Sequence, residues 1–131
     1  MRKIIATLLL LGFLSPAWGA TQDSTSSQAP KSEHGIATVY AMKFVGRRTA
    51  DGEQLDRAHL TAAHRTLPFG TLVEVVNRHN GRKAVVRIND RGPFRRRAVI
   101  DLSPAAAAAL GLTRHGSAPV LLKIAKLAAE G

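Results

Sequence analysis

The chain has 131 residues, of which 45% are hydrophobic and none is cysteine, and its formal net charge at pH 7 is +10. This length allows one domain of ordinary size and excludes a second. The lack of cysteine excludes disulfide bonds and a lipid-modified N-terminal cysteine. The positive charge predicts an acidic partner.

The first nineteen residues have the pattern of a secretory signal sequence. Arg2 and Lys3 supply the positive charge, residues 4–13 form the apolar run, and small residues precede the expected cleavage site after Gly19. The apolar run is about half the roughly 20 residues that a membrane-spanning helix needs. We therefore expect a periplasmic or secreted protein with no stable membrane anchor, whose charge falls to +8 when Arg2 and Lys3 are removed from the +10 of the whole chain.

Residues 20–34 (ATQDSTSSQAPKSEH) are polar, rich in Ser and Thr, and without periodicity. Such a segment buries too little apolar surface to order itself, so we expect a flexible linker. The remaining sequence shows no second change of composition. It predicts one folded domain over residues 35–127, followed by a short tail at 128–131.

Short alternating apolar runs within this domain are typical of strands. The clearest are residues 72–77 and 83–89, which flank Asn80-Gly81. Asn-Gly favours the positive φ values of a type I′ turn, so these two runs are expected to pair as a hairpin. Three further strands are expected at residues 36–40, 98–102 and 119–125.

One short helix is expected after the fourth of these runs. Ser103 is the predicted N-cap, Pro104 lies in the first turn, five alanines follow, and Gly111 is the predicted C-cap. Many short strands with a single helix predict the all-β class. A closed barrel is favoured because closure removes exposed strand edges.

Three segments combine polar or ionisable residues with glycine or proline at expected strand ends. They are residues 46–53 (GRRTADGE), 61–75 (TAAHRTLPFGTLVEV) and 86–94 (VRINDRGPF). Cleavage of a glycosidic bond commonly requires two carboxyl groups. Glu53 after the Asp51-Gly52 turn and Asp90 before the Arg91-Gly92-Pro93 turn supply such a pair from distant parts of the chain.

Each of these residues also has a structural interpretation. Asp90 could bond its own turn or pair with Arg91, and Glu53 could be a residue of an exposed loop. His64 could orient a substrate, hydrogen-bond a carboxylate, or pack beside the following Pro68 and Phe69.

Other polar residues are weaker candidates. The five histidines lack the spacing of a zinc site, so no metal is expected. Asp101 alternates with Ile100 and Leu102 on an expected strand, where a structural carboxylate bonded to backbone is favoured. Residues 95–97, three consecutive arginines, form either a solvated face or a contact with acidic groups of a ligand.

Together the three segments, continued by residues 99–111 (VIDLSPAAAAALG), resemble the rare lipoprotein A family of septal-ring lytic transglycosylases. The resemblance covers nearly all of residues 35–127. It implies a small six-stranded double-psi β-barrel related to expansins, with one short helix. The sequence departs from the family at Val39, Ala41 and Val45, where Trp, Gly and His are usual.

The resemblance implies a lyase that cleaves the β-1,4 bond between N-acetylmuramic acid and N-acetylglucosamine and forms 1,6-anhydromuramic acid ends. The implied catalytic residues are Asp90, Glu53 and His64. In this hypothesis Asp90 protonates the leaving oxygen and accepts the C6 hydroxyl proton, Glu53 stabilises charge, and His64 positions the sugar. The expected substrate-binding residues are Tyr40, Thr49, Arg65, Asn89 and Arg91.

The expected partner is the peptidoglycan glycan strand, whose lactyl groups and stem peptides carry carboxylates that arginine binds well. We expect a monomer that needs no cofactor and binds no nucleic acid. Two alternatives remain: an expansin-like protein that binds glycan and loosens the wall without cleavage, and a hydrolytic muramidase, which would need space for a water between the two carboxyls.

Overall fold

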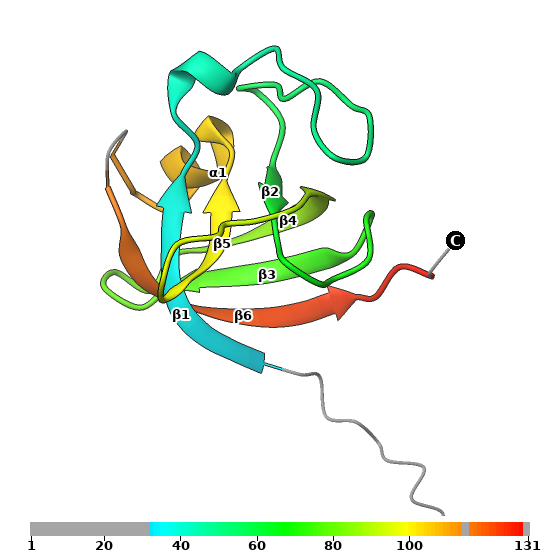
Figure 1. Ribbon diagram of the computed structural model, residues 1–131. Helices are drawn as coiled ribbons and strands as arrows, with labels where there is room; N and C mark the ends of the chain where they lie inside the picture. The colour runs from blue at the N-terminus through cyan, green and yellow to red at the C-terminus, as the bar shows by residue number, and fades with distance from the viewer. Residues whose placement is uncertain (1–31, 114–115, 130–131) are drawn as a thin grey trace, which may run out of the picture.

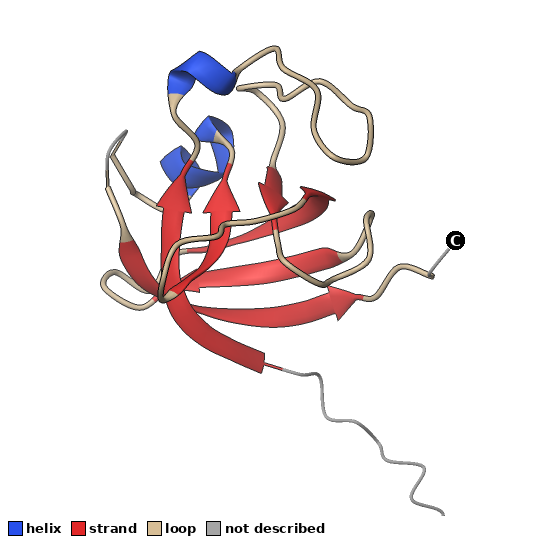
Figure 2. Cartoon of the chain, in the orientation of Figure 1, coloured by secondary structure: helices blue, strands red, loops and turns tan. Residues whose placement is uncertain are grey.

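The computed structural model describes residues 32–113 and 116–129. Six strands form a closed barrel in the order β1-β5-β2-β4-β3-β6 (Figure 1). Their bounds are β1 (Ser32–Val39), β2 (Thr61–Ala63), β3 (Leu72–Asn77), β4 (Lys83–Asp90), β5 (Ala98–Leu102) and β6 (Ala118–Lys126). Two short helical segments accompany them in Figure 2, α1 (Pro104–Ala109) and a 3₁₀ helix (Met42–Phe44). The predicted all-β, six-stranded barrel with one short α-helix is confirmed.

The barrel combines two parallel strand pairs with four antiparallel ones. β1 pairs in parallel with β5, and β2 pairs in parallel with β4. A parallel pair needs a connection that crosses from one end of the barrel to the other. The long segment between β1 and β2 lies at the same end of the barrel as α1 (Figure 1).

Alternation along the strands separates an apolar core from a polar outer surface. On β3 and β4 the side chains of Val73, Val75, Val86 and Ile88 are fully buried. Helix α1 extends this core through Ala106, Ala107 and Leu110, which join the same cluster. The outward residues near the strand ends are therefore free to carry polar chemistry.

The N-terminal cap of α1 forms as predicted. The Ser103 hydroxyl accepts a hydrogen bond from the backbone N–H of Ala106 at 3.2 Å, and Pro104 is the first helical residue. At the other end Leu110, not Gly111, is the C-cap. Gly111 follows it with a φ of +77°, the left-handed conformation that ends many helices.

The hairpin of β3 and β4 is confirmed, but the predicted type I′ turn is wrong. That turn needs positive φ at both central residues, and among the described residues Gly81 has it whereas Asn80 does not. A wider loop forms because side chains satisfy its backbone: Asn77 Oδ1 accepts from the N–H of His79, and Asn80 Oδ1 from that of Arg82, each at 2.9 Å.

The predicted boundary between linker and domain is also wrong. β1 begins at Ser32, so residues 32–34 of the expected linker belong to the barrel. They are ordered because their backbone pairs with residues 121–123 of β6, which needs no apolar side chains. The expected signal sequence and the rest of the linker, residues 1–31, lie outside the described residues.

Two further differences concern the short β2 strand and the C-terminal boundary. Residues 61–63 were not expected as a separate strand, because three residues are too few to show an alternating pattern. Beyond the expected domain end at residue 127, the N–H of Ala128 donates to Thr71 Oγ1 at 3.1 Å. In the described part of the chain, every helix is too short or too polar to cross a bilayer.

Gly35 provides a test of the packing between β1 and β5. A Cβ atom at this position would lie 2.3 Å from Cγ1 of Val99. We expect Gly35→Ala to lower the free energy of unfolding by about 1–3 kcal/mol through overpacking. Because Val99→Ala removes the obstructing methyl groups, the double variant should lose less than the sum of the single losses. Urea unfolding followed by circular dichroism measures this, and additive losses would contradict the contact.

Candidate functional site

Three hollows surround Tyr40, which follows the end of β1. The largest, about 750 Å³, is lined by Thr38, Asp101 and the segment 91–98. A second, about 250 Å³, is lined by Asp90, Thr49 and neighbouring arginines, and a third, about 180 Å³, lies against α1. Because Tyr40 lines all three, a ligand extending from one hollow to the next would contact its ring.

Asp90 is held by three hydrogen-bond donors. Its Oδ1 accepts from the backbone N–H of Ala50 at 2.8 Å and of Arg91 at 2.9 Å, and its Oδ2 accepts from the Tyr40 hydroxyl. Burial and the contact with Asp90 raise the pKa of Tyr40 above its ordinary value, so the hydroxyl remains a donor. The Asp90 carboxylate is thereby fixed in one orientation at the edge of the second hollow.

Glu53 is engaged in an ion pair with Arg87 of β4. Two guanidinium nitrogens contact the two carboxylate oxygens, and Nη2 lies 2.7 Å from Oε2. These hydrogen bonds, followed by the contact with Asp51, lower the pKa of Glu53 to about 2. Glu53 is therefore an anion at neutral pH and cannot serve as the proton donor.

The turn before Glu53 forms as the sequence predicts. Asp51 Oδ1 accepts from the Thr49 hydroxyl at 2.6 Å and from the N–H of Glu53 at 3.0 Å. Thr49, one of the expected substrate-binding residues, is buried and uses its hydroxyl within this turn. The turn also supplies the N–H of Ala50 to Asp90. Its main effect is thus to orient Asp90.

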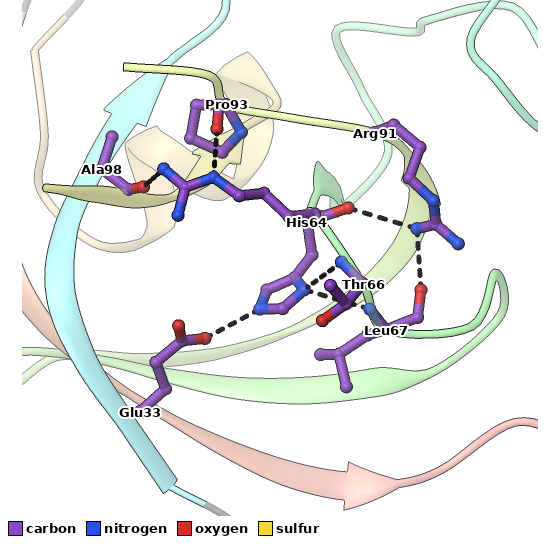
Figure 3. Close-up of polar contacts among 8 residues, drawn as sticks. Glu33, His64, Thr66, Leu67, Arg91, Pro93 and Ala98 are labelled. Atoms are coloured by element: carbon purple, nitrogen blue, oxygen red, sulfur yellow. Dashed lines mark hydrogen bonds and ion pairs between the residues drawn. The ribbon is translucent and has the colours of Figure 1, made fainter. Parts of the chain in front are cut away.

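The His64 imidazole is buried and lines none of the three hollows. It bonds Glu33 and the turn that follows β2 (Figure 3). Its Nδ1 accepts from the N–H of Thr66 at 3.2 Å and of Leu67 at 3.1 Å, and its Nε2 lies 2.8 Å from Oε1 of Glu33. Nδ1 is therefore the acceptor nitrogen, and Nε2 carries the proton given to Glu33. His64 therefore hydrogen-bonds a carboxylate, which was one of its expected roles. That carboxylate belongs to Glu33, a residue of the segment expected to be linker.

The main chain of His64 nevertheless lies next to Asp90. Its backbone N–H donates to the Asp90 carbonyl at 3.1 Å, because β2 and β4 run side by side. The imidazole fixes the turn that follows β2, and that turn adjoins the end of β4. We infer that His64 is a positioning residue for Asp90.

Two expected substrate-binding arginines are used to hold backbone. Arg65 donates to the carbonyls of Pro93 at 2.7 Å and Ala98 at 2.6 Å, and also to that of Arg95. Arg91 donates to the carbonyl of Leu67 at 2.8 Å and stacks on a phenylalanine ring. Figure 3 shows the Arg91 contacts with the turn beside His64. Both guanidinium groups shape the wall of the largest hollow.

Asn89, a further expected binding residue, is 1% exposed and lines none of the three hollows. Its Oδ1 has no hydrogen-bond partner among the described residues. Its position coincides with an irregularity in the pairing of β2 with β4, where Ala62 faces Ile88 and Ala63 faces Asp90. Asn89 is the extra residue of this bulge, a feature that re-aims the next side chain.

Asp101 lies on a strand as predicted, but its expected hydrogen bond to backbone is wrong. It lines the largest hollow, and its Oδ1 accepts from the Thr38 hydroxyl at 3.2 Å rather than from backbone. Burial raises the pKa of Asp101 to about 6. The alternation with Ile100 and Leu102 was the available signal, because two core residues on either side turn Asp101 outward.

The structure thus brings Tyr40, Thr49 and Asp90 to one hollow and holds Glu53 and His64 beside it through other contacts. Among residues 32–113 and 116–129, no three His, Cys, Asp or Glu side chains gather closely enough to hold a metal ion.

Comparison with known sequences identifies a family and several close relatives. A family model described as "Lytic transglycolase" matches residues 32–122. The chain is 58% identical over 90 residues to the "Probable endolytic peptidoglycan transglycosylase RlpA" of Synechocystis sp., covering 69% of this chain and 28% of that protein. It is 44% identical over 115 residues to the "Endolytic peptidoglycan transglycosylase RlpA" of Haemophilus influenzae, covering 86% and 40%. The chain therefore spans well under half the length of these curated relatives.

Comparison with solved structures shows the same fold. The apo expansin of Clavibacter michiganensis superimposes with a TM-score of 0.59 at 20% identity, over 76% of this chain and 52% of that one. The Streptomyces papain inhibitor gives a TM-score of 0.54 at 28% identity, over 71% and 93%. The expected relation of this barrel to expansins is confirmed at the level of fold.

The ion pair of Glu53 predicts a specific dependence of stability on pH. Because its pKa is about 2 in the folded protein and near 4.3 in an unfolded chain, its contribution is present above about pH 4.3 and is lost towards pH 2. We expect Glu53→Gln to flatten the loss of unfolding free energy in this range. Arg87→Gln should flatten it in the same direction but less fully, because the contact with Asp51 remains. An unchanged slope in both variants would contradict the pairing.

The contacts of His64 predict the effect of removing its side chain. His64→Ala leaves two backbone N–H groups and one carboxylate without a partner, so we expect a loss of about 1–3 kcal/mol in unfolding free energy. Glu33→Gln, which keeps an acceptor for Nε2, should lose less. Urea unfolding of both variants gives the comparison. A His64→Ala protein as stable as the wild type would contradict the positioning role.

Proposed function

Because the chain belongs to the lytic transglycolase family, we propose that its barrel is a lytic transglycosylase acting on peptidoglycan glycan strands. The bond cleaved is the β-1,4 bond between N-acetylmuramic acid and N-acetylglucosamine, and the new ends carry 1,6-anhydromuramic acid. The observation that carries this proposal is the Asp90 carboxylate, oriented by three donors at a hollow beside an aromatic ring.

Forming an anhydro end requires a group that accepts the proton of the C6 hydroxyl while its oxygen attacks C1. Asp90 suits this role because an ionised carboxylate accepts hydrogen bonds and its donors are already in place. The preset geometry means that little reorganisation is needed when the sugar binds. Asp90 is accordingly the proposed catalytic base.

Glu53 and His64 are proposed to act through Asp90. Glu53 and Arg87 fasten the loop that supplies the N–H of Ala50, and His64 fastens the turn whose backbone bonds the Asp90 carbonyl. Arg65 holds part of the wall of the largest hollow through the carbonyls of Pro93, Arg95 and Ala98. Each of these side chains is engaged within the protein, so they are positioning residues.

The proposed substrate also fits the charge of the chain. Residues 95–97, three exposed arginines, line the largest hollow, where lactyl or stem-peptide carboxylates of a glycan strand could pair with them. We further propose that residues 1–19 direct export and that the mature protein acts as a monomer outside the cytoplasm. Peptidoglycan is found there, which agrees with the proposed substrate.

Digestion of purified peptidoglycan followed by mass spectrometry of the products tests the activity. We expect 1,6-anhydromuramic acid ends. Reducing ends heavier by about one water would identify a muramidase instead. Binding to glycan strands without new ends would favour the expansin-like alternative, so both results would reject the proposed reaction.

Asp90→Asn tests the proposed role of the carboxylate. The change keeps the shape of the side chain but removes the base, so formation of anhydro ends should fall by a factor of about 10² or more. The fold, checked by circular dichroism, and glycan binding should persist. Asp56→Asn, in an exposed turn outside the hollows, is the matched control and should cleave normally. Full activity in Asp90→Asn would reject this mechanism.

A further inference from the structure

The register of the barrel places two carboxylates in one row across four strands. Thr38 of β1 pairs with Asp101 of β5. On its other side Asp101 pairs with Ala63 of β2, which pairs in turn with Asp90 of β4. Residues opposite one another in a sheet project from the same face. Asp101 and Asp90 therefore point to the same side, with only the methyl group of Ala63 between them.

The separation of the two carboxylates follows from the strand spacing. Two intervals of about 4.7–4.9 Å place the Cα atoms of Asp101 and Asp90 about 9–10 Å apart. Only the Ala63 methyl group stands between the two side chains, so a gap is left between the carboxyl groups. Here the C6 hydroxyl of the sugar would occupy that space. The bulge at Asn89 is essential, because without it Asn89 would face Ala63 in place of Asp90.

The two carboxyl groups have opposite surroundings. Asp90 accepts from three donors, whereas among the described residues Asp101 accepts from the Thr38 hydroxyl alone. The charged and titratable groups that act on Asp101 are Arg95 and Asp90, with Tyr40 close by. Burial raises the pKa of Asp101 to about 6, so at mildly acidic pH it retains a proton that it could donate.

We propose that Asp101 is the proton donor of the cleavage reaction and acts as a pair with Asp90 across Ala63. This inference rests on the proposed function. Asp101 gives its proton to the glycosidic oxygen as the bond from C1 breaks, and the leaving sugar departs with a free 4-hydroxyl. Asp90 takes the proton of the C6 hydroxyl as that oxygen bonds to C1. No water is consumed, and a proton passes through solvent from Asp90 back to Asp101.

Tyr40 fixes where the scissile bond would lie. It follows the end of β1, and its ring lines the same hollow as Thr38 and Asp101. Its hydroxyl donates to Asp90, and its ring lines both the hollow with Asp101 and the hollow with Asp90. A glycan strand crossing the Tyr40 ring would place one sugar on each side. The bond between the sugars would then lie between the two carboxyl groups.

The test measures formation of anhydro ends by wild type, Asp101→Asn and the control Asp56→Asn. We expect Asp101→Asn to cleave about 10²-fold or more slowly while it still binds glycan strands. Asp56→Asn should match the wild type. Circular dichroism verifies that each variant is folded.

A second variant, Thr38→Val, keeps a β-branched side chain but removes the hydroxyl. Cleavage by the wild type should fall as the pH rises through about 6, because Asp101 loses its proton there. The hydrogen bond from Thr38 lowers the pKa of Asp101, so its removal should move this fall to higher pH. If Asp101 had only a structural role, the pH dependence of cleavage would be the same in Thr38→Val as in the wild type.

The outcomes separate this inference from the proposed function. Near-normal cleavage by Asp101→Asn, or an unmoved profile in Thr38→Val, overturns the donor role while Asp90→Asn still tests the reaction itself. Carbon-13 titration of the Asp101 carboxyl gives an independent readout, and a midpoint near the ordinary 3.8 also overturns the inference. A wild-type protein that forms no anhydro ends overturns both.

Discussion

The site depends on the pairing of β2 with two neighbouring strands, β4 and β5, which run in opposite directions to each other. This three-residue strand is parallel to β4 and antiparallel to β5, and all of its residues are buried. The N–H of Thr61 also donates to the buried hydroxyl of Ser103, so the cap of α1 holds the strand. If β2 slipped by one residue, Ala63 would face the core and the two aspartates would no longer share a row.

Three acidic residues near the hollows show how surroundings assign different chemistry to one functional group. Glu53 faces a guanidinium and is held as an anion. The Asp90 carboxyl accepts hydrogen bonds from two backbone N–H groups and from the Tyr40 hydroxyl, which hold it in one orientation. The Asp101 carboxyl is largely shielded from solvent and accepts a hydrogen bond from the Thr38 hydroxyl. The exposed arginines 95–97 line the largest hollow together with Asp101, and the charge of Arg95 acts on that carboxyl from within the hollow.

Local patterns in the sequence were sufficient to predict most of the fold. Alternation located five of the six strands, and the cap residues located α1. The bounds of β1 could not be predicted, because Glu33 is ordered by backbone pairing with β6 rather than by its own apolar neighbours. For the site, the turn after Asp90 predicted that its carboxyl would be held in one orientation, as its contacts with the N–H groups of Ala50 and Arg91 show. The alternation around Asp101 could show that its side chain points outward, but not that it shares a row with Asp90, because a register between strands distant in sequence is a property of the closed barrel.

The contacts of Arg65 have an evolutionary consequence for the loop after β4. Arg65 donates hydrogen bonds to the carbonyls of Pro93, Arg95 and Ala98 in this loop. The path of the loop is therefore fixed through main-chain atoms. The side chains of residues 94–97 are displayed outward and contribute little to folding, as the 83% exposure of Phe94 illustrates. Mutational drift at these four positions would leave the barrel intact. Substitutions there would change the lining of the largest hollow without disturbing the row that holds Asp101 and Asp90.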